Sequence, residues 1–140
     1  MSGGGKATAS AIMNNALVSD FVSWVDRIML ELGKDRRAVA YNFNLYEHED
    51  EFAIQLIGAK KFDLTDEDWP CYEAFTSGED LFILPFSVVG SKYANGQRKA
   101  KSLIKSYLER GKAAARFKRS RGVALGFVGG DLEYVYVRDA

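Results

Sequence analysis

Carboxylates are the most numerous chemistry-bearing side chains of this sequence, and they gather in one stretch. Eleven Asp and Glu residues lie between Glu47 and Asp80, against two lysines. Carboxylates can act as the acid and the base of a hydrolase, or they can bind a hard cation through their oxygens. No pair stands apart as an acid and a base with divergent pKa values, and the acidic run 63–68 lacks the glycine and glutamate of a calcium-binding EF-hand loop. The pattern therefore favours a solvated acidic surface over a hydrolase or a metal site.

Few other side chains could carry a reaction. His48 is the only histidine and falls in a predicted turn, so it cannot build a multi-histidine metal site or a convincing nucleophile–histidine pair. Cys71 is the only cysteine, and we expect it to be a small buried hydrophobe, because its acidic surroundings supply no cation to activate a thiolate. Residues 3–8, GGGKAT, lack the Ser or Thr that directly follows Gly-Lys in a phosphate-binding loop. We therefore expect no catalytic residue, no metal and no cofactor.

Charge is divided between the two parts of the chain. The whole chain balances 19 Lys and Arg against 19 Asp and Glu. Residues 1–90 carry 7 basic and 15 acidic side chains, whereas residues 91–140 carry 12 and 4. Such halves either neutralise each other inside the fold or face charged partners.

Two acidic loops, 47–51 and 63–68, are the candidate binding site. They lie beside aromatic residues, and aromatic anchors rimmed by charge are common at protein interfaces. An acidic surface suits a basic partner, whose approach it would steer. For the tryptophan of this set, the alternative is that it fills the core beneath its loop. The residues predicted to bind a partner are Glu49, Asp50, Glu51, Asp66, Glu67, Asp68 and Trp69.

The basic helical region 97–121 offers a second interpretation. Its ten Lys and Arg residues could follow the phosphates of a nucleic acid. They also lie opposite an apolar stripe, where a solvated face is expected in any case, and no nucleic-acid module signature accompanies them. Nucleic-acid binding is therefore the alternative function.

Hydrophobic periodicity predicts the elements that must position these groups. A broad apolar face predicts a helix over 19–32 with Ser19 as its N-cap, and a second amphipathic helix is expected over 96–110, with one or two more helical turns over 113–118. Period-two alternation predicts a hairpin of strands 38–46 and 51–57, a short edge strand at 72–75 and a buried strand over 81–86 that ends at Pro85.

The stretch 122–137 is the clearest hairpin signal, because alternating apolar residues surround the turn sequence Gly129-Gly130-Asp131. We expect a helix to approach its small face, with Ala124 and Gly126, closely. The element order α-β-β-(β)-β-α-α-β-β predicts an α+β fold, a mainly antiparallel sheet of 5–6 strands with flanking helices.

Residues 1–12 read as a flexible leader or a cloning remnant, and residues 13–140 as a single α+β domain. No apolar run approaches the roughly 20 residues that span a bilayer, and the N-terminus lacks the apolar centre of a signal peptide. One cysteine fits a reducing compartment, so we expect a cytoplasmic protein without membrane contact.

Several runs resemble small bacterial immunity proteins, which accompany polymorphic or contact-dependent growth-inhibition toxins. The runs are 68–73 (DWPCYE), 82–85 (FILP), 107–111 (YLERG) and 122–132 (GVALGFVGGDL). The resemblance implies a non-enzymatic cytoplasmic protein that binds and neutralises a cognate toxin, and the acidic loops would then dock on a basic, nuclease-like domain. Besides the nucleic-acid alternative, an enzyme with an unrecognised carboxylate site stays open.

Overall fold

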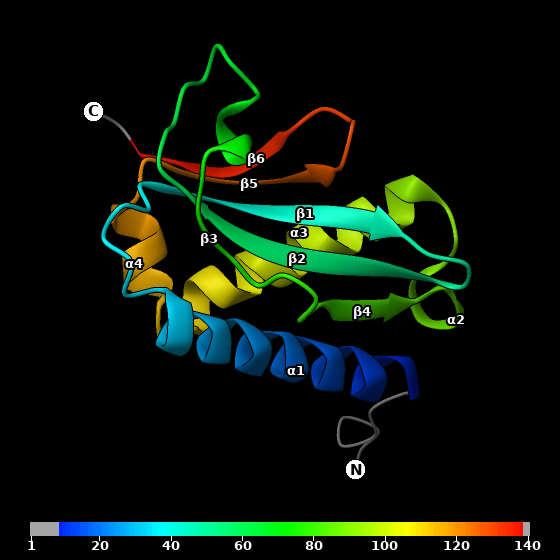
Figure 1. The fold of residues 1–140 in the computed structure, drawn as a ribbon. Helices are drawn as coiled ribbons and strands as arrows, with labels where there is room; N and C mark the ends of the chain where they lie inside the picture. The colour runs from blue at the N-terminus through cyan, green and yellow to red at the C-terminus, as the bar shows by residue number, and fades with distance from the viewer. Residues whose placement is uncertain (1–8, 139–140) are drawn as a thin grey trace.

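The computed structural model describes residues 9–138, which form one sheet with helices packed against it (Figure 1). Within those residues no helix is long and apolar enough to cross a bilayer. The elements in chain order are α1 (Ala9–Leu32), β1 (Ala40–Glu47), β2 (Glu51–Ala59), the 3-10 turn η2 (Trp69–Cys71), β3 (Glu73–Thr76), β4 (Phe82–Pro85), α2 (Phe86–Val89), α3 (Tyr93–Arg110), α4 (Ala114–Arg119), β5 (Gly122–Phe127) and β6 (Glu133–Val137).

The sheet has six strands in the order β3-β2-β1-β5-β6, with β4 also paired to β2. β4 and β3 share one edge of β2, where β4 pairs with residues 51–54 and β3 with residues 57–59. All pairs are antiparallel except β1 and β5, which run parallel from Tyr41 opposite Val123 to Leu45 opposite Phe127. The predicted α+β class and strand number are confirmed. The short helix α2 and the parallel pair were not predicted, because alternation assigns faces to a strand but not its neighbours.

Helices α1, α3 and α4 cover one face of the sheet and form the main core with it (Figure 1). Phe21 of α1 packs edge-on against Phe82 with ring centroids 5.1 Å apart. Phe117 of α4 packs against Tyr41 at 4.5 Å. Apolar residues at helical spacing on α1 and α3 therefore face the period-two apolar positions of β1, β2 and β5.

Within residues 9–138, no α-helix covers the other face of the sheet. The loop 60–72 lies over one part of it and encloses a smaller core around Trp69, Ile57 and Ala124. Along β1 and β2 this face carries a row of polar side chains instead. Asn42 donates to Asn44, and Asn44 and Tyr46 both donate to Gln55 Oε1, at 2.9 and 3.0 Å.

The hairpin of β5 and β6 is confirmed, but a bulge changes which of its residues face the helices. Ala124 pairs with Tyr134 and Val123 with Tyr136, so Val135 is an extra residue in β6. The bulge places Tyr134 in the smaller core and Tyr136 against the main one, so the two do not share a face.

The expectation that a helix approaches the small face of this hairpin is wrong. A Cβ at Gly126 would lie 2.6 Å from the carbonyl oxygen of Asp131, so the hairpin's own turn folds back over this glycine. Ala124 lies under the loop that carries Trp69. Gly129, at φ 85°, gives the turn the left-handed conformation that lets it fold in this way.

Helix α1 begins ten residues before its predicted start. It runs through Ser19, which is therefore not its N-cap, because the alanines, Met13 and Leu17 ahead of it favour a helix. Of the predicted leader 1–12, residues 9–12 are helical and residues 1–8 lie outside the described residues. The predicted end, before Gly33, is confirmed.

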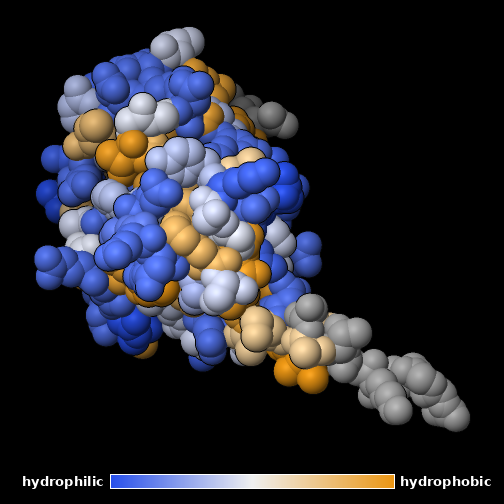
Figure 2. Space-filling view, turned by 90° about the vertical axis from the view of Figure 1, so that its right-hand side faces the viewer, coloured by the Kyte–Doolittle hydropathy of each residue, from blue (hydrophilic) through white to orange (hydrophobic). Residues whose placement is uncertain are grey.

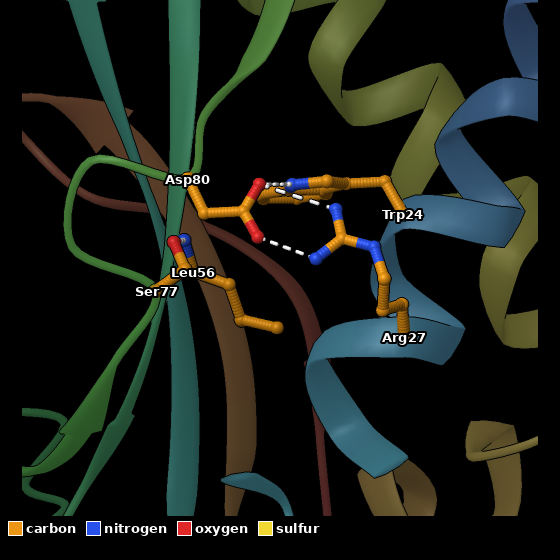
Figure 3. A network of polar contacts seen from close by, with 5 residues as sticks. All are labelled: Trp24, Arg27, Leu56, Ser77 and Asp80. Carbon is orange, nitrogen blue, oxygen red and sulfur yellow. Dashed lines mark hydrogen bonds and ion pairs between the residues drawn. The ribbon is translucent and has the colours of Figure 1, made fainter. Parts of the chain in front are cut away.

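Asp80, in the turn between β3 and β4, fastens α1 to the edge of the sheet (Figure 3). Its carboxylate accepts a 3.0 Å hydrogen bond from Trp24 Nε1 and a bidentate pair from Arg27. These donors, Arg27 first, lower the pKa of Asp80. Behind it, Ser77 and Leu56 exchange two hydrogen bonds of 3.1 and 2.8 Å that hold the turn against β2.

Two substitutions of Asp80 should separate the contribution of its hydrogen bond with Trp24 from that of its ion pair with Arg27. Asp80→Ala leaves the buried Trp24 N–H without an acceptor and should lower the free energy of unfolding by about 1–3 kcal/mol in urea denaturation. Asp80→Asn keeps an acceptor and loses only a partly solvated ion pair, so it should cost less than about 1 kcal/mol. Since the folded-state pKa is depressed, the ion-pair contribution is present above the unfolded-state pKa and disappears as the pH falls through the folded-state value. Equal losses for both variants would contradict this assignment.

Candidate functional site

The residues predicted to bind a partner occupy two places on the fold. Glu49 and Asp50 form the turn between β1 and β2, with Glu51 at the start of β2, at the right of Figure 1. The segment 66–68 belongs to the loop at the top of Figure 1, beside β6. The two groups therefore do not form a single cluster.

These carboxylates stay free of the chain's own cations. Within residues 9–138 no Lys or Arg forms an ion pair with any of the six, and the Glu51 carboxylate lies 3.4 Å from the His48 ring nitrogen Nδ1. His48 lies exposed in the turn, as predicted. The Lys and Arg side chains that do form ion pairs are Arg27, Arg37 and Lys101, with Asp80, Asp35 and Glu133. The acidic segments therefore face solvent as an uncompensated negative surface.

Trp69 is buried rather than presented to a partner. Its side chain is 1% exposed, and its indole N–H donates a 3.0 Å hydrogen bond to the Tyr134 hydroxyl. Phe62 packs against it with ring centroids 5.3 Å apart. Trp69 therefore fills the core beneath its loop and is not an exposed anchor. Its contribution to binding would be to hold the acidic segment in place.

Further contacts fix the shape of the acidic loop. Asp63 accepts hydrogen bonds from the backbone and hydroxyl of Thr65, which lower its pKa. Glu67 Oε1 accepts a 2.7 Å hydrogen bond from the backbone N–H of Leu132. The loop is therefore tied to the first residues after the turn between β5 and β6.

A cavity of about 570 Å³ lies where the parallel strands β1 and β5 end. Tyr93, at the first turn of α3, donates a 2.8 Å hydrogen bond to Glu47, which raises the pKa of Tyr93. The Tyr93 ring also packs 4.7 Å from that of Phe127. The lining residues that matter here are Tyr46, Glu47, Tyr93, Phe127 and Asp131. We call this the acidic cavity, because aromatic rings and two carboxylates line it.

The acidic cavity is linked to both predicted acidic segments. Glu47 leads directly into the turn 49–51, while Asp131 precedes Leu132, to which Glu67 is bonded. Figure 2 looks onto the end of the molecule at the right of Figure 1; hydrophilic residues cover most of it, and apolar residues show between them. Such a surface combines charge with apolar contact area.

Sequence reasoning missed the cavity residues Tyr93, Phe127 and Asp131 as site candidates. They come from α3 and from the turn after β5, more than 40 positions from the β1–β2 turn. A prediction that β5 runs parallel to β1 would have brought the ends of both strands to one edge, where ligand sites in parallel sheets commonly lie. No local pattern in the sequence carries that pairing.

The basic region lies on the helical side. Of its cations, Lys101 pairs with Glu133, whose pKa is lowered by Gln97 and Lys101, and Lys99 contacts Asn14. The others form no ion pair within residues 9–138. They are Arg98, Lys105, Arg110, Lys112, Arg116, Lys118, Arg119 and Arg121.

Two further expectations concern reactive groups. Cys71 is exposed, so the expectation that it is buried is wrong; it ends η2 with its side chain outside the small core that holds its neighbour Trp69. Among residues 9–138 no cluster of three His, Cys, Asp or Glu side chains is arranged to hold a metal ion.

The role assigned to Trp69 can be tested with a matched aromatic pair. Trp69→Phe removes the hydrogen bond to Tyr134 and leaves a gap in the small core, and should lower the free energy of unfolding by about 1–3 kcal/mol. Tyr72→Ala, on the same loop, removes a 45% exposed ring and should cost within about 1 kcal/mol. Chemical denaturation of both variants measures this. A larger loss for Tyr72→Ala would contradict the assignment.

Comparison with known proteins adds no relative from which a role could be transferred. No protein-family model matches the chain, and neither curated sequences nor solved structures give a significant match.

Proposed function

We propose that this protein is a non-enzymatic, immunity-type protein that binds and neutralises a cognate toxin through its acidic surface. The partner's binding face would be basic, as is typical around the active cleft of a nuclease. The observation that carries the proposal is the uncompensated charge: Glu49, Asp50, Asp66 and Asp68 have no cationic partner within residues 9–138. An opposed surface would supply the counter-charge and speed the encounter.

The acidic cavity supports the proposal in a second way. Charged rims alone give little net affinity, and binding energy concentrates in aromatic residues that become buried. Tyr93 is 58% exposed and sits over Phe127 beside Glu47. A Lys or Arg side chain of the partner could pair with the carboxylates and contact the rings by cation–π attraction.

The first test reverses charge at the β1–β2 turn. The triple variant Glu49→Lys, Asp50→Lys, Glu51→Lys should lower the association rate constant for a cognate toxin domain, sought among the products of neighbouring genes, at least tenfold at low salt. Stopped-flow or surface plasmon resonance at two salt concentrations measures the rate. At equimolar concentration the unaltered protein should abolish the toxin's activity.

The matched control reverses three charges on the helical side, through Arg98→Glu, Lys105→Glu and Arg110→Glu. Since these residues are exposed and do not line the acidic cavity, association should be unchanged or faster. Full toxin activity in the presence of excess unaltered protein would refute the proposal, as would equal slowing by the two triple variants.

The second candidate is nucleic-acid binding through the basic region 97–121. It is favoured by the number of cations on α3 and α4 that lack ion pairs. Under this alternative, a fluorescently labelled duplex or single strand should bind at 50 mM salt and lose affinity by orders of magnitude by 200 mM. The variant Arg98→Glu, Lys105→Glu, Arg110→Glu should then abolish binding, and the acidic triple variant should not. No change in anisotropy at low salt would eliminate this candidate.

A further inference from the structure

A second cavity, of about 580 Å³, lies at the opposite ends of the same two parallel strands and is lined by cations. Two come from the turn between α1 and β1, and three from α4 and the segment that follows it. The cations are Lys34, Arg36, Arg116, Arg119 and Arg121. We call this the cationic cavity. None of the five forms an ion pair within residues 9–138.

Among the described residues, one carboxylate lines the cationic cavity, and it is already engaged. Asp35 accepts hydrogen bonds from Arg37 Nε and Arg37 NH2 at 3.0 and 2.7 Å. These bonds hold the pKa of Asp35 at about 2, so it is ionised and paired at any ordinary pH. Lys34, Arg36, Arg116 and Arg119 therefore line the cavity without a free counter-ion among the described residues, whereas the guanidinium group of Arg121 lies over the Phe62 ring, 5.5 Å from its centroid.

A tyrosine whose ring is packed in the core also lines the cavity. Tyr41 is 2% exposed, lines the cationic cavity, and makes no hydrogen bond through its hydroxyl to any described residue. Burial raises the pKa of this hydroxyl, while the charges of Arg116 and Arg119 act in the opposite direction. Tyr41, Arg116 and Arg119 line the same cavity, so one ligand bound there would face all three. An O–H donor beside two planar guanidinium groups suits the oxygens of a phosphate group.

Core contacts position the segment that carries these cations. Phe117 packs against both Tyr41 and Tyr107, at 4.5 and 5.5 Å. The Tyr107 hydroxyl donates to Asp26 of α1 at 2.7 Å, and Asp26 also accepts the backbone N–H of Lys112 at 2.9 Å. Asp26 thereby fixes the turn before α4, and burial together with this bond raises the pKa of Tyr107. The guanidinium groups thus extend from a backbone that the core holds in place.

A hollow of about 510 Å³ adjoins the cationic cavity and shares Lys34, Arg116 and Arg119 with it. Part of its lining is apolar, from Met29, Leu30, Ala113 and Ala115. An anion with an organic portion would therefore find charge in one cavity and apolar contact in the next.

We propose that the cationic cavity binds the phosphate group of a small phosphate ester, with the organic portion in the adjoining hollow. This goes beyond the toxin-binding function and does not depend on it, since no residue of the acidic cavity takes part. A nucleic acid is the less favoured source of the phosphate, because the cations of three segments line one cavity together with Tyr41 rather than follow a line along a helix.

Isothermal titration with phenyl phosphate, and with inorganic phosphate as the minimal probe, tests the proposal. Tyr41→Phe keeps the ring in the core and removes only the hydroxyl, so affinity for both probes should fall about tenfold. The double variant Arg116→Gln, Arg119→Gln should weaken binding further, to below detection. Arg110→Gln removes one charge from the nearby end of α3 but does not line the cavity, and should bind as the unaltered protein does.

Thermal unfolding of each variant shows that the fold is retained. Equal affinity of Tyr41→Phe and the unaltered protein would overturn the proposal. The cations would then attract anions by charge alone, without a contribution from the Tyr41 hydroxyl. Loss of affinity in Arg110→Gln as large as in the double variant would overturn it in the same way. Binding of a duplex oligonucleotide without binding of phenyl phosphate would assign the cations to nucleic acid and overturn it too.

Discussion

The parallel pairing of β1 with β5 is the constraint on which the rest of this structure depends. Residues 41–45 pair with 123–127, so each residue lies 82 positions along the chain from its partner. This pairing makes β1 and β5 neighbours in the middle of the sheet and closes the helical layer of α3 and α4 over one face. Parallel strands begin at the same end of the sheet and finish at the other. Each end of the sheet therefore brings together residues from both halves of the chain. The two cavities described above lie at these two ends.

The same geometry keeps the opposite charges of the chain apart. The acidic first half places its turn 47–51 beyond the end of β1, whereas the basic second half places Arg116 and Arg119 near its start. Neither set is consumed by the other, since Arg27, Arg37 and Lys101 are the only Lys and Arg residues that form ion pairs among the described residues. Exposed ion pairs contribute little to stability in any case, so the fold loses little by leaving these charges unpaired. Stability comes instead from the aromatic core that Phe21, Phe117 and their neighbours build.

Sequence reasoning reached the elements but not their arrangement. Alternation and turn residues located β1, β2, β4 and the β5–β6 hairpin nearly to the residue, because these signals are local. Partner and direction of a strand depend on contacts far along the chain, so the parallel pair was missed, and with it the cavity residues Tyr93, Phe127 and Asp131. The extra residue Val135 also defeated the assignment of faces in β6. A bulge reverses the faces of the residues that follow it, and the alternation of residue types does not reveal where the bulge lies. Five of the six acidic residues are exposed and Glu51 is partly buried, whereas Trp69 is buried and bonded to Tyr134, 65 residues away.

An uncompensated charge at each end of a rigid sheet has a physical consequence beyond contact with a ligand. A molecule with acidic and basic ends carries a dipole that orients a charged partner before contact, and this effect acts over about one Debye length, some 8 Å at physiological salt. The dipole would turn the acidic cavity toward a basic protein and the cationic cavity away from it. Both ends could then be occupied at once, because β1 and β5 hold them apart and no side chain lines both cavities. A ligand in one cavity could affect the other only through the shared strands β1 and β5. Their side chains are packed in the core and have little freedom to move, so binding at one cavity should change the affinity of the other little.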